Sequence, residues 1–129
     1  GGKALDGAFV PVGNLVVNEQ LKGLYPNEAA INEIVSAYEG KYGKGSRSIF
    51  AGYAWDAIGM MKAAMAPALK TAQPGTPAFR EAVRTNLENI KNFAGASGVF
   101  NLSPTDHVGL DERSRVLVKI ENGNWVFVK

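Results

Sequence analysis

The adjacent pair Asp106-His107 is the only constellation in this sequence that resembles general-base chemistry. Adjacent residues do not usually form a working dyad through their own side chains, and the sequence has no G-x-S-x-G elbow to supply a serine nucleophile. We therefore favour a local role, in which Asp106 binds backbone amides of a turn over residues 103–109 and His107 packs or hydrogen-bonds nearby. A small hydrolase or lyase that uses the pair is the alternative.

Two other polar features also invite a chemical interpretation. The segment GKYGKGS at residues 40–46 is not a phosphate loop, because Ser46 follows Gly45 where the motif G-x-x-x-x-G-K-[ST] requires a lysine. Asp56 lies early in a predicted helix, where a carboxylate interacts favourably with the helix dipole. We favour this structural role for Asp56 over that of a buried functional acid.

Three aromatic residues, Phe50, Tyr53 and Trp55, lie close together at the start of a helix that is otherwise rich in small residues. Core packing is the default interpretation of such a stripe. Aromatic side chains near a helix N-terminus can also wall a pocket, in which the free amide N–H groups of that end meet an anionic or carbonyl ligand. The residues alone leave both interpretations open.

The first element that must position these side chains is a strand over residues 7–12, GAFVPV. It is apolar on both faces, which suits the interior of a parallel sheet that helices cover on both sides. The apolar residues 15–17 are predicted to continue it in an extended conformation. The rest of the chain does not obviously supply enough neighbours for such a strand.

Apolar residues that recur every three or four positions predict helices over residues 27–42, 49–68 and 77–90. Many of the apolar residues in the second helix are small, so another element must approach it closely. The predicted start and stop signals are Pro26 with Gly40 and Gly43 for the first helix, Ser46 or Ser48 with Pro67 for the second, and Thr76-Pro77 for the third.

The pattern becomes extended after Gly98. Residues 99–102 are a short strand candidate, and residues 103–112 are irregular. The dipeptide Asn122-Gly123 accepts two left-handed backbone conformations cheaply, so it predicts a tight turn between two strands. This hairpin would join strands 115–120 and 125–128 and would pair Ile120 with Trp125, Val118 with Phe127 and Val116 with Lys129.

Composition excludes several classes of function. The 129 residues carry a formal net charge of +2, with 46% hydrophobic and 20% charged residues, which is typical of one soluble domain. The lack of cysteine excludes disulfides and thiolate metal sites, and a single histidine excludes paired-histidine zinc motifs, so neither a metal nor a cofactor is expected.

The densest basic stretch, Lys41–Arg47, has only three cations and is interpreted as a solvated loop, so nucleic acid is not an expected partner. We expect no membrane span and no signal peptide within these residues.

Several segments together resemble a known family. They are GKALDGAFVPVGNLVV, AYEGKYGKGSRSIFAGYAWDAIGMM, AFREAVRTNLENI and GVFNLSPTDHVGLDERSRVLVKIENGNW. In this order they look like the closing third of an ABC-transporter substrate-binding protein of the branched-chain amino acid type, which has the type I periplasmic binding fold. The resemblance spans essentially all 129 residues. The combination of YAWDA, SPTDHVGLD and a terminal hairpin is its most specific part.

The resemblance implies a partial α/β fold with three helices, a few strands and a C-terminal β-hairpin. Residues 1–129 would be the C-terminal portion of a two-lobe protein. The strand and hinge crossing would occupy about 7–17, the helical cover of the first lobe about 26–94, and the return crossing and hairpin about 98–129. The missing N-terminal portion would be a partner, and without it we expect the chain to self-associate through exposed apolar surfaces.

The resemblance also implies a function without catalysis. A periplasmic or other extracytoplasmic protein of this kind captures a small solute, such as an amino acid or an aromatic or organic acid, and delivers it unchanged to an ABC permease. Ser48, Phe50 and Tyr53 match the start of the helix that lines the cleft, and are the expected ligand-binding residues. The same fold also serves as a ligand-sensing domain of signalling proteins, which is the alternative function.

Overall fold

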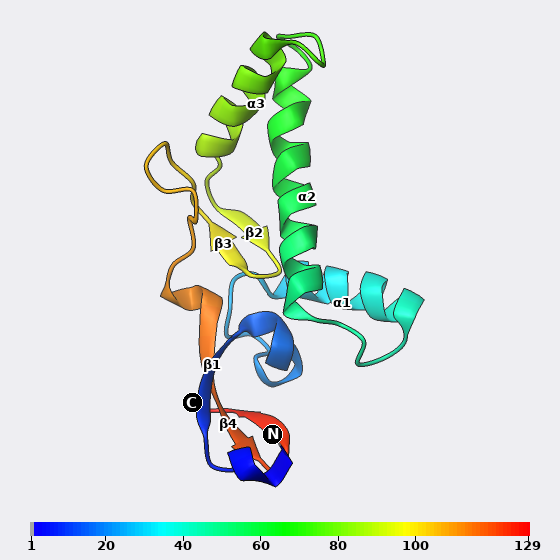
Figure 1. The fold of residues 1–129 in the computed structure, drawn as a ribbon, viewed down its shortest axis with the longest axis vertical. Coiled ribbons are helices and arrows are strands. Elements are labelled where there is room, and N and C mark those ends of the chain that lie inside the picture. The colour runs from blue at the N-terminus through cyan, green and yellow to red at the C-terminus, as the bar shows by residue number, and fades with distance from the viewer. Residues whose placement is uncertain (1) are drawn as a thin grey trace.

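The computed structural model describes residues 2–129, which form an elongated molecule with a small sheet at one end and two packed helices at the other (Figure 1). In chain order the helices and strands are β1 (Phe9–Gly13), α1 (Glu28–Tyr42), α2 (Ile49–Ala68), α3 (Pro77–Glu88), β2 (Phe93–Gly95), β3 (Gly98–Phe100), β4 (Arg115–Glu121) and β5 (Asn124–Phe127). Short 3-10 segments are η1 (Gly2–Leu5), η2 (Asn14–Gln20) and η3 (Glu112–Ser114). The predicted mixed α/β fold is confirmed.

β4 is the central strand of a three-stranded antiparallel sheet and pairs with β1 on one side and β5 on the other. Side chains alternate between the two faces of a strand. On the inner face of β4, Val116 and Val118 are buried and pack against Val17 and Leu21. The sheet and the segment that follows β1 therefore share one hydrophobic core.

β1 is not the interior strand of a parallel sheet that its apolar sequence predicted. It is an antiparallel edge strand, in which Val10 lies opposite Val118 and Val12 opposite Val116, and the Phe9 side chain is 57% exposed. Pro11 is compatible with an edge strand, because proline has no N–H to donate to a second neighbour. The apolar run reflects side chains on both faces of β1, but the described residues cover only one of these faces.

Residues 15–17 do not continue the strand, so that prediction was wrong. They lie in η2, where Leu15 and Val17 are buried. Asn14 at the start of η2 is also buried, and its side-chain Nδ2 donates to the carbonyl oxygen of Arg113 at 3.0 Å. A short apolar run does not distinguish a strand from a helical turn, so tertiary contacts determined the outcome.

The predicted helices α1 and α2 are confirmed. α1 runs through Gly40 and stops at Gly43, which has a φ of 94° that favours glycine. Ser48 is the N-cap of α2, since its hydroxyl accepts a hydrogen bond from the Ala51 N–H at 3.3 Å. Pro67 lies in the last turn of α2, as its sequence position predicted.

The third predicted helix is also confirmed, although α3 ends at Glu88, before Ile90. The Thr76 hydroxyl accepts a hydrogen bond from the Phe79 N–H at 3.1 Å and caps its start. α3 packs along α2, where Val83 contacts the buried Ala64 and Ala68. Small side chains on α2 thus permit the close approach that its composition predicted.

A second, two-stranded sheet lies beside α2 (Figure 1). β3 corresponds to the strand predicted over residues 99–102, but β2 was not predicted. Gly95 and Gly98 lie opposite each other in this hairpin, and Phe93 lies opposite Phe100. From the sequence, these glycines indicated only the change from a helical to an extended pattern. The turn of the hairpin projects between α2 and the larger sheet.

The C-terminal hairpin has the predicted register. Ile120 pairs with Trp125 and Val118 with Phe127, whereas β5 ends at Phe127, before the predicted pair of Val116 with Lys129. Asn122 and Gly123 have φ values of 52° and 75°, as a tight hairpin turn with two left-handed residues requires. A local sequence signal was therefore sufficient to define this element.

Candidate functional site

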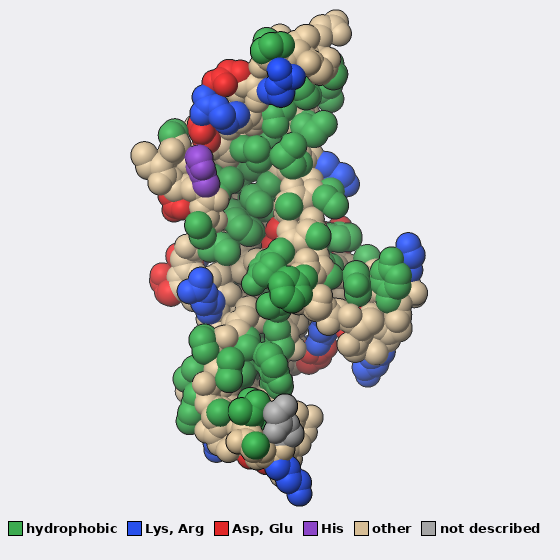
Figure 2. All heavy atoms as spheres, viewed as in Figure 1, with side chains coloured by type: hydrophobic (Ala, Val, Ile, Leu, Met, Phe, Trp, Pro, Cys, Tyr) green, Lys and Arg blue, Asp and Glu red, His purple; other side chains and the backbone are tan. Residues whose placement is uncertain are grey.

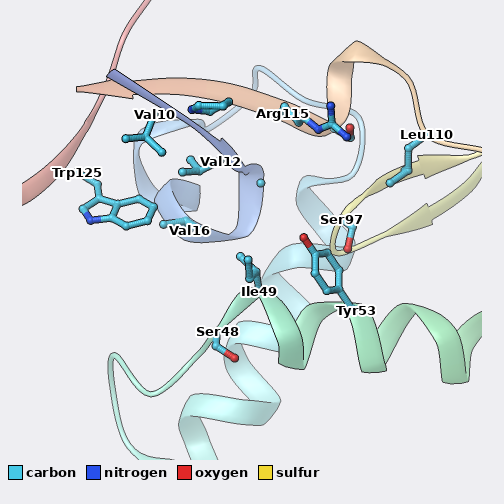
Figure 3. Close-up of a pocket in the computed structure, with 13 residues that line it drawn as sticks. Val10, Val12, Val16, Ser48, Ile49, Tyr53, Ser97, Leu110, Arg115 and Trp125 are labelled. Atoms are coloured by element: carbon cyan, nitrogen blue, oxygen red, sulfur yellow. The ribbon is translucent and has the colours of Figure 1, made fainter. Parts of the chain in front are cut away.

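A cavity of about 520 Å³ lies between the N-terminal end of α2, the β2–β3 turn and the larger sheet (Figure 3). Its wall is mostly apolar, with a few polar groups. This composition is usual for a site that binds a small organic molecule. The lining residues are Val10, Pro11, Val12, Gly13, Val16, Ser48, Ile49, Tyr53, Ser97, Leu110, Ser114, Arg115 and Trp125.

Two of the three expected ligand-binding residues line this cavity. Tyr53 points into it from α2 (Figure 3). Ser48 is at the start of the same helix, but its hydroxyl oxygen already accepts the capping hydrogen bond from Ala51. Phe50 is not among the lining residues: its side chain is 74% exposed, and its ring lies edge-on to Tyr53 with centroids 6.2 Å apart.

Other lining residues were not identified from the sequence. Arg115 is the first residue of β4, Ser97 is in the β2–β3 turn, and Trp125 is on β5. They come from segments far apart in the chain, and none lies in a recognisable motif. Only the fold brings them together, so no local signal would have identified them.

Asp56 links α2 to the β2–β3 turn that forms part of the cavity wall. Its side chain is 2% exposed, and its two oxygens accept hydrogen bonds from the backbone N–H groups of Ala96 at 2.5 Å and Ser97 at 2.8 Å. The favoured structural role is therefore right, but its partners are two distant amides rather than the dipole of its own helix. Tyr53 and Ser97 lie on two elements that Asp56 joins.

The Asp106-His107 pair forms the turn that the sequence predicted. One carboxylate oxygen of Asp106 accepts hydrogen bonds from the Val108 and Gly109 N–H groups, both at 2.9 Å. These bonds, the one from Gly109 first, lower the pKa of Asp106 from its ordinary value of 3.8. The ionised Asp106 carboxylate therefore contributes its full stabilisation of the folded state at pH values above 3.8. This stabilisation is lost as the pH falls from 3.8 through the lowered pKa.

His107 does not take part in this arrangement. Its side chain is exposed, and its Nε2 atom lies 3.5 Å from a carboxylate oxygen of Glu88 on α3. The carboxylate of Asp106 is directed to backbone amides instead. The geometry therefore favours the local role of both residues over a hydrolase site.

The basic loop after α1 is only partly solvated. Arg47 donates to a carboxylate oxygen of Glu19 at 2.6 Å and lies 3.6 Å from one of Glu39, and its side chain is 15% exposed. The solvated-loop interpretation is wrong for this residue, because the two carboxylates hold it against η2 and α1. Lys41 and Lys44 are exposed, as expected.

The described part of the chain contains no group of three or more histidine and acidic side chains placed to hold a metal ion. None of the helices within residues 2–129 combines the length and apolar character needed to cross a membrane.

Comparison with known proteins gives matches among solved structures alone. No family model and no curated protein matches this chain. An extracellular ligand-binding receptor from Rhodopseudomonas palustris HaA2 is 41% identical, with a TM-score of 0.90, and another from Rhodopseudomonas palustris is 39% identical, also with a TM-score of 0.90. A protein assigned as a branched-chain amino acid ABC transporter from Rhodospirillum rubrum is 25% identical, with a TM-score of 0.65.

Each of these matches covers 99% of this chain. The chain spans only 36% of the length of the two receptors and 32% of the third protein. The resemblance to the branched-chain amino acid type of substrate-binding protein is confirmed. The chain therefore has the structure of a portion of a type I periplasmic-binding-like fold, of the kind found in extracellular ligand-binding receptors.

Proposed function

We propose that this chain is the C-terminal portion of a periplasmic solute-binding protein that captures a small amino acid or organic acid and delivers it to an ABC permease. The cavity at the start of α2 carries this proposal, since it combines an apolar wall with the hydroxyls of Tyr53 and Ser97 and the guanidinium of Arg115. The ligand-binding receptors that share its fold support it.

The location of the cavity suggests how binding would be coupled to a change of shape. Residues of β1 form one part of its wall and residues of α2 form another. In the proposed arrangement, residues 7–17 and the return near residue 98 connect two lobes. Residues 26–94 cover the first lobe, and the C-terminal hairpin completes the portion over residues 98–129. A solute that contacts both lobes favours the closed state, because only that state makes all of its contacts.

Within this cavity, Tyr53 is the proposed ligand-binding residue whose hydroxyl is best placed to reach a solute. The hydroxyl of Ser48 has its acceptor position occupied by the Ala51 N–H, but it still has a proton to donate. The proposed role of Phe50 is different: it lies beside Tyr53 at the rim, where its ring would contact a solute only as the second lobe closes.

The test is Tyr53→Phe in the full-length protein. Titration calorimetry with a panel of amino acids and of aromatic and organic acids should identify a solute for the unmodified protein. Loss of one hydrogen bond to a charged solute should then weaken binding by roughly 10-fold or more in the variant. Tyr42→Phe is the matched control, because Tyr42 is an exposed tyrosine on α1 that does not line the cavity. Equal affinity for Tyr53→Phe and Tyr42→Phe, or no binding to any member of the panel, would refute the proposal.

A further inference from the structure

Arg115 is the only charged residue among the described residues that line the cavity. It is the first residue of β4 and lies opposite Gly13 of β1, and Figure 3 shows its side chain at the cavity. No aspartate or glutamate of residues 2–129 lines the same wall. The wall that this chain supplies therefore carries a net positive charge, which attracts an anionic solute.

The guanidinium group of Arg115 makes no hydrogen bond or ion pair within residues 2–129. In Arg113, two positions earlier, the same group is paired with the Asp111 carboxylate at 2.7 Å. A guanidinium presents a planar fork of N–H donors that matches the two oxygens of a carboxylate, and in Arg115 this fork is available to a solute. The other arginines of the chain all have a hydrogen-bond partner for this group, and they are Arg47, Arg80 and Arg84.

Two hydroxyl groups of the cavity wall are available in the same way. Tyr53 points into the cavity from α2, and Ser97 lies in the β2–β3 turn (Figure 3). No hydrogen bond within the described part of the chain uses either hydroxyl. The backbone N–H of Ser97 donates to the Asp56 carboxylate at 2.8 Å, which fixes the turn against α2. Each hydroxyl can therefore donate to a carboxylate oxygen, and hydrogen bonds to a charged acceptor are among the strongest.

The other end of the cavity is apolar. Figure 3 shows Trp125 and Val10 at one end, apart from Tyr53 and Ser97 at the other. Hydrophobic side chains also gather on the surface between the larger sheet and the start of α2 (Figure 2). This separation matches a solute that has a charged group at one end and a hydrocarbon body at the other.

We propose that Arg115 binds the carboxylate of the solute, and that the solute is an apolar carboxylic acid without an α-amino group. This assignment rests on the proposed function and narrows its two classes of solute to one. An α-ammonium group lies one carbon atom from the carboxylate, so it would be placed close to the Arg115 guanidinium. No acidic side chain in the described wall neutralises it, and two like charges in a cavity repel each other.

The test uses titration calorimetry on the full-length protein with matched pairs of probes. The acids are isocaproate, phenylacetate and hydrocinnamate, and each is compared with the same acid carrying an α-amino group, namely leucine, phenylglycine and phenylalanine. We expect at least one acid to bind, and to bind roughly 10-fold or more tightly than its amino acid. Arg115→Gln should weaken binding of that acid by roughly 10- to 100-fold, because a charged hydrogen-bonded contact is lost.

Arg113→Gln is the matched control, since Arg113 is two positions away, is already paired with Asp111 and does not line the cavity. It should leave the affinity for the acid unchanged. The neutral primary amide of the acid provides a second control. The unmodified protein should prefer the acid to its amide, and Arg115→Gln should remove most of that preference. A cavity that was merely distorted by the substitution would bind both probes more weakly and keep the preference.

Tighter binding of an amino acid than of its matched acid would overturn the assignment while leaving the proposed function intact. Equal affinity of Arg115→Gln and Arg113→Gln for the acid would do the same. A preference for the acid over its amide that survives in Arg115→Gln would also overturn it, because another group would then bind the carboxylate. If none of these acids and amino acids bound, the assignment and the proposed function would both be refuted.

Discussion

The two faces of α2 differ in the size of their side chains. The face that packs within this chain carries small residues, and a Cβ atom added at Gly59 would lie 2.8 Å from the Phe93 ring. Another face carries Ile58, Met61 and Met65, which are 58%, 40% and 37% exposed. Side-chain size therefore follows the distance to the neighbouring element, being small where that element is within van der Waals contact.

The polar groups of the two faces differ in the same way. On the inner face, Asp56 is buried and both of its oxygens are used by backbone amides of the β2–β3 turn. On the outer face, Lys62 lies one helical turn from Ile58 and is exposed. The inner face is thus complete in this chain, whereas the outer face is apolar without being covered. Substitutions on the two faces should have very different effects on the stability of the isolated chain.

Among substitutions in α2, the largest effect is expected for Asp56→Ala on the inner face. It leaves the N–H group of the buried Ala96 and that of the half-buried Ser97 without an acceptor, which should cost about 3 kcal/mol of the free energy of unfolding. Urea denaturation of the 129-residue chain measures this loss. The amide exchange rates of Ala96 and Ser97 should rise with it, because the β2–β3 turn loses its attachment to α2.

Asp106→Ala is the matched control for this prediction. Asp106 also accepts two backbone N–H groups, from Val108 and Gly109, but Asp106 itself is exposed to solvent. Water replaces the carboxylate there, so the urea midpoint should change far less than in Asp56→Ala. If the two variants were equally destabilised, burial would not be the property that distinguishes Asp56.

An intermediate effect is expected for Ala64→Leu. Ala64 is 1% exposed and lies against Val83 of α3, so three additional carbon atoms would separate the two helices. Overpacking of this kind should cost about 2 kcal/mol, as measured by urea denaturation. Ala54→Leu places the same side chain on the exposed face of α2 and should leave the stability nearly unchanged. A comparable loss in both variants would contradict the difference between the two faces.

Local signals explain why much of the fold was predictable. The Thr76-Pro77 pair and Asn122-Gly123 each determine backbone geometry through their own chemistry, so α3 and the C-terminal hairpin were predicted correctly. β1 was predicted as a strand but in the wrong sheet environment. Its apolar pattern shows that both faces can be buried, but it does not identify the strand that pairs with it.

The cavity was less predictable, because it depends on contacts between distant segments. The resemblance to the family pointed to Tyr53 and Ser48, and both line the cavity. Arg115 and Ser97 have no such local marker, since they enter the wall only through the pairing of β4 with β1 and the attachment of the β2–β3 turn to Asp56. A sequence pattern records periodicity along one element, whereas a cavity wall is assembled from several.

The smallest effect is expected for Ile58→Ser on the exposed face of α2. Isoleucine and serine have similar helix propensities, so the substitution changes mainly apolar surface that is already exposed in the isolated chain. The free energy of unfolding should therefore change by no more than about 0.5 kcal/mol. Ile34→Ser on α1 is the matched control: Ile34 is 1% exposed, and its replacement should cost about 3 kcal/mol or more. If Ile58→Ser instead destabilised the isolated chain as strongly as Ile34→Ser, this face of α2 would already be buried there, and the contrast between the two faces would fail.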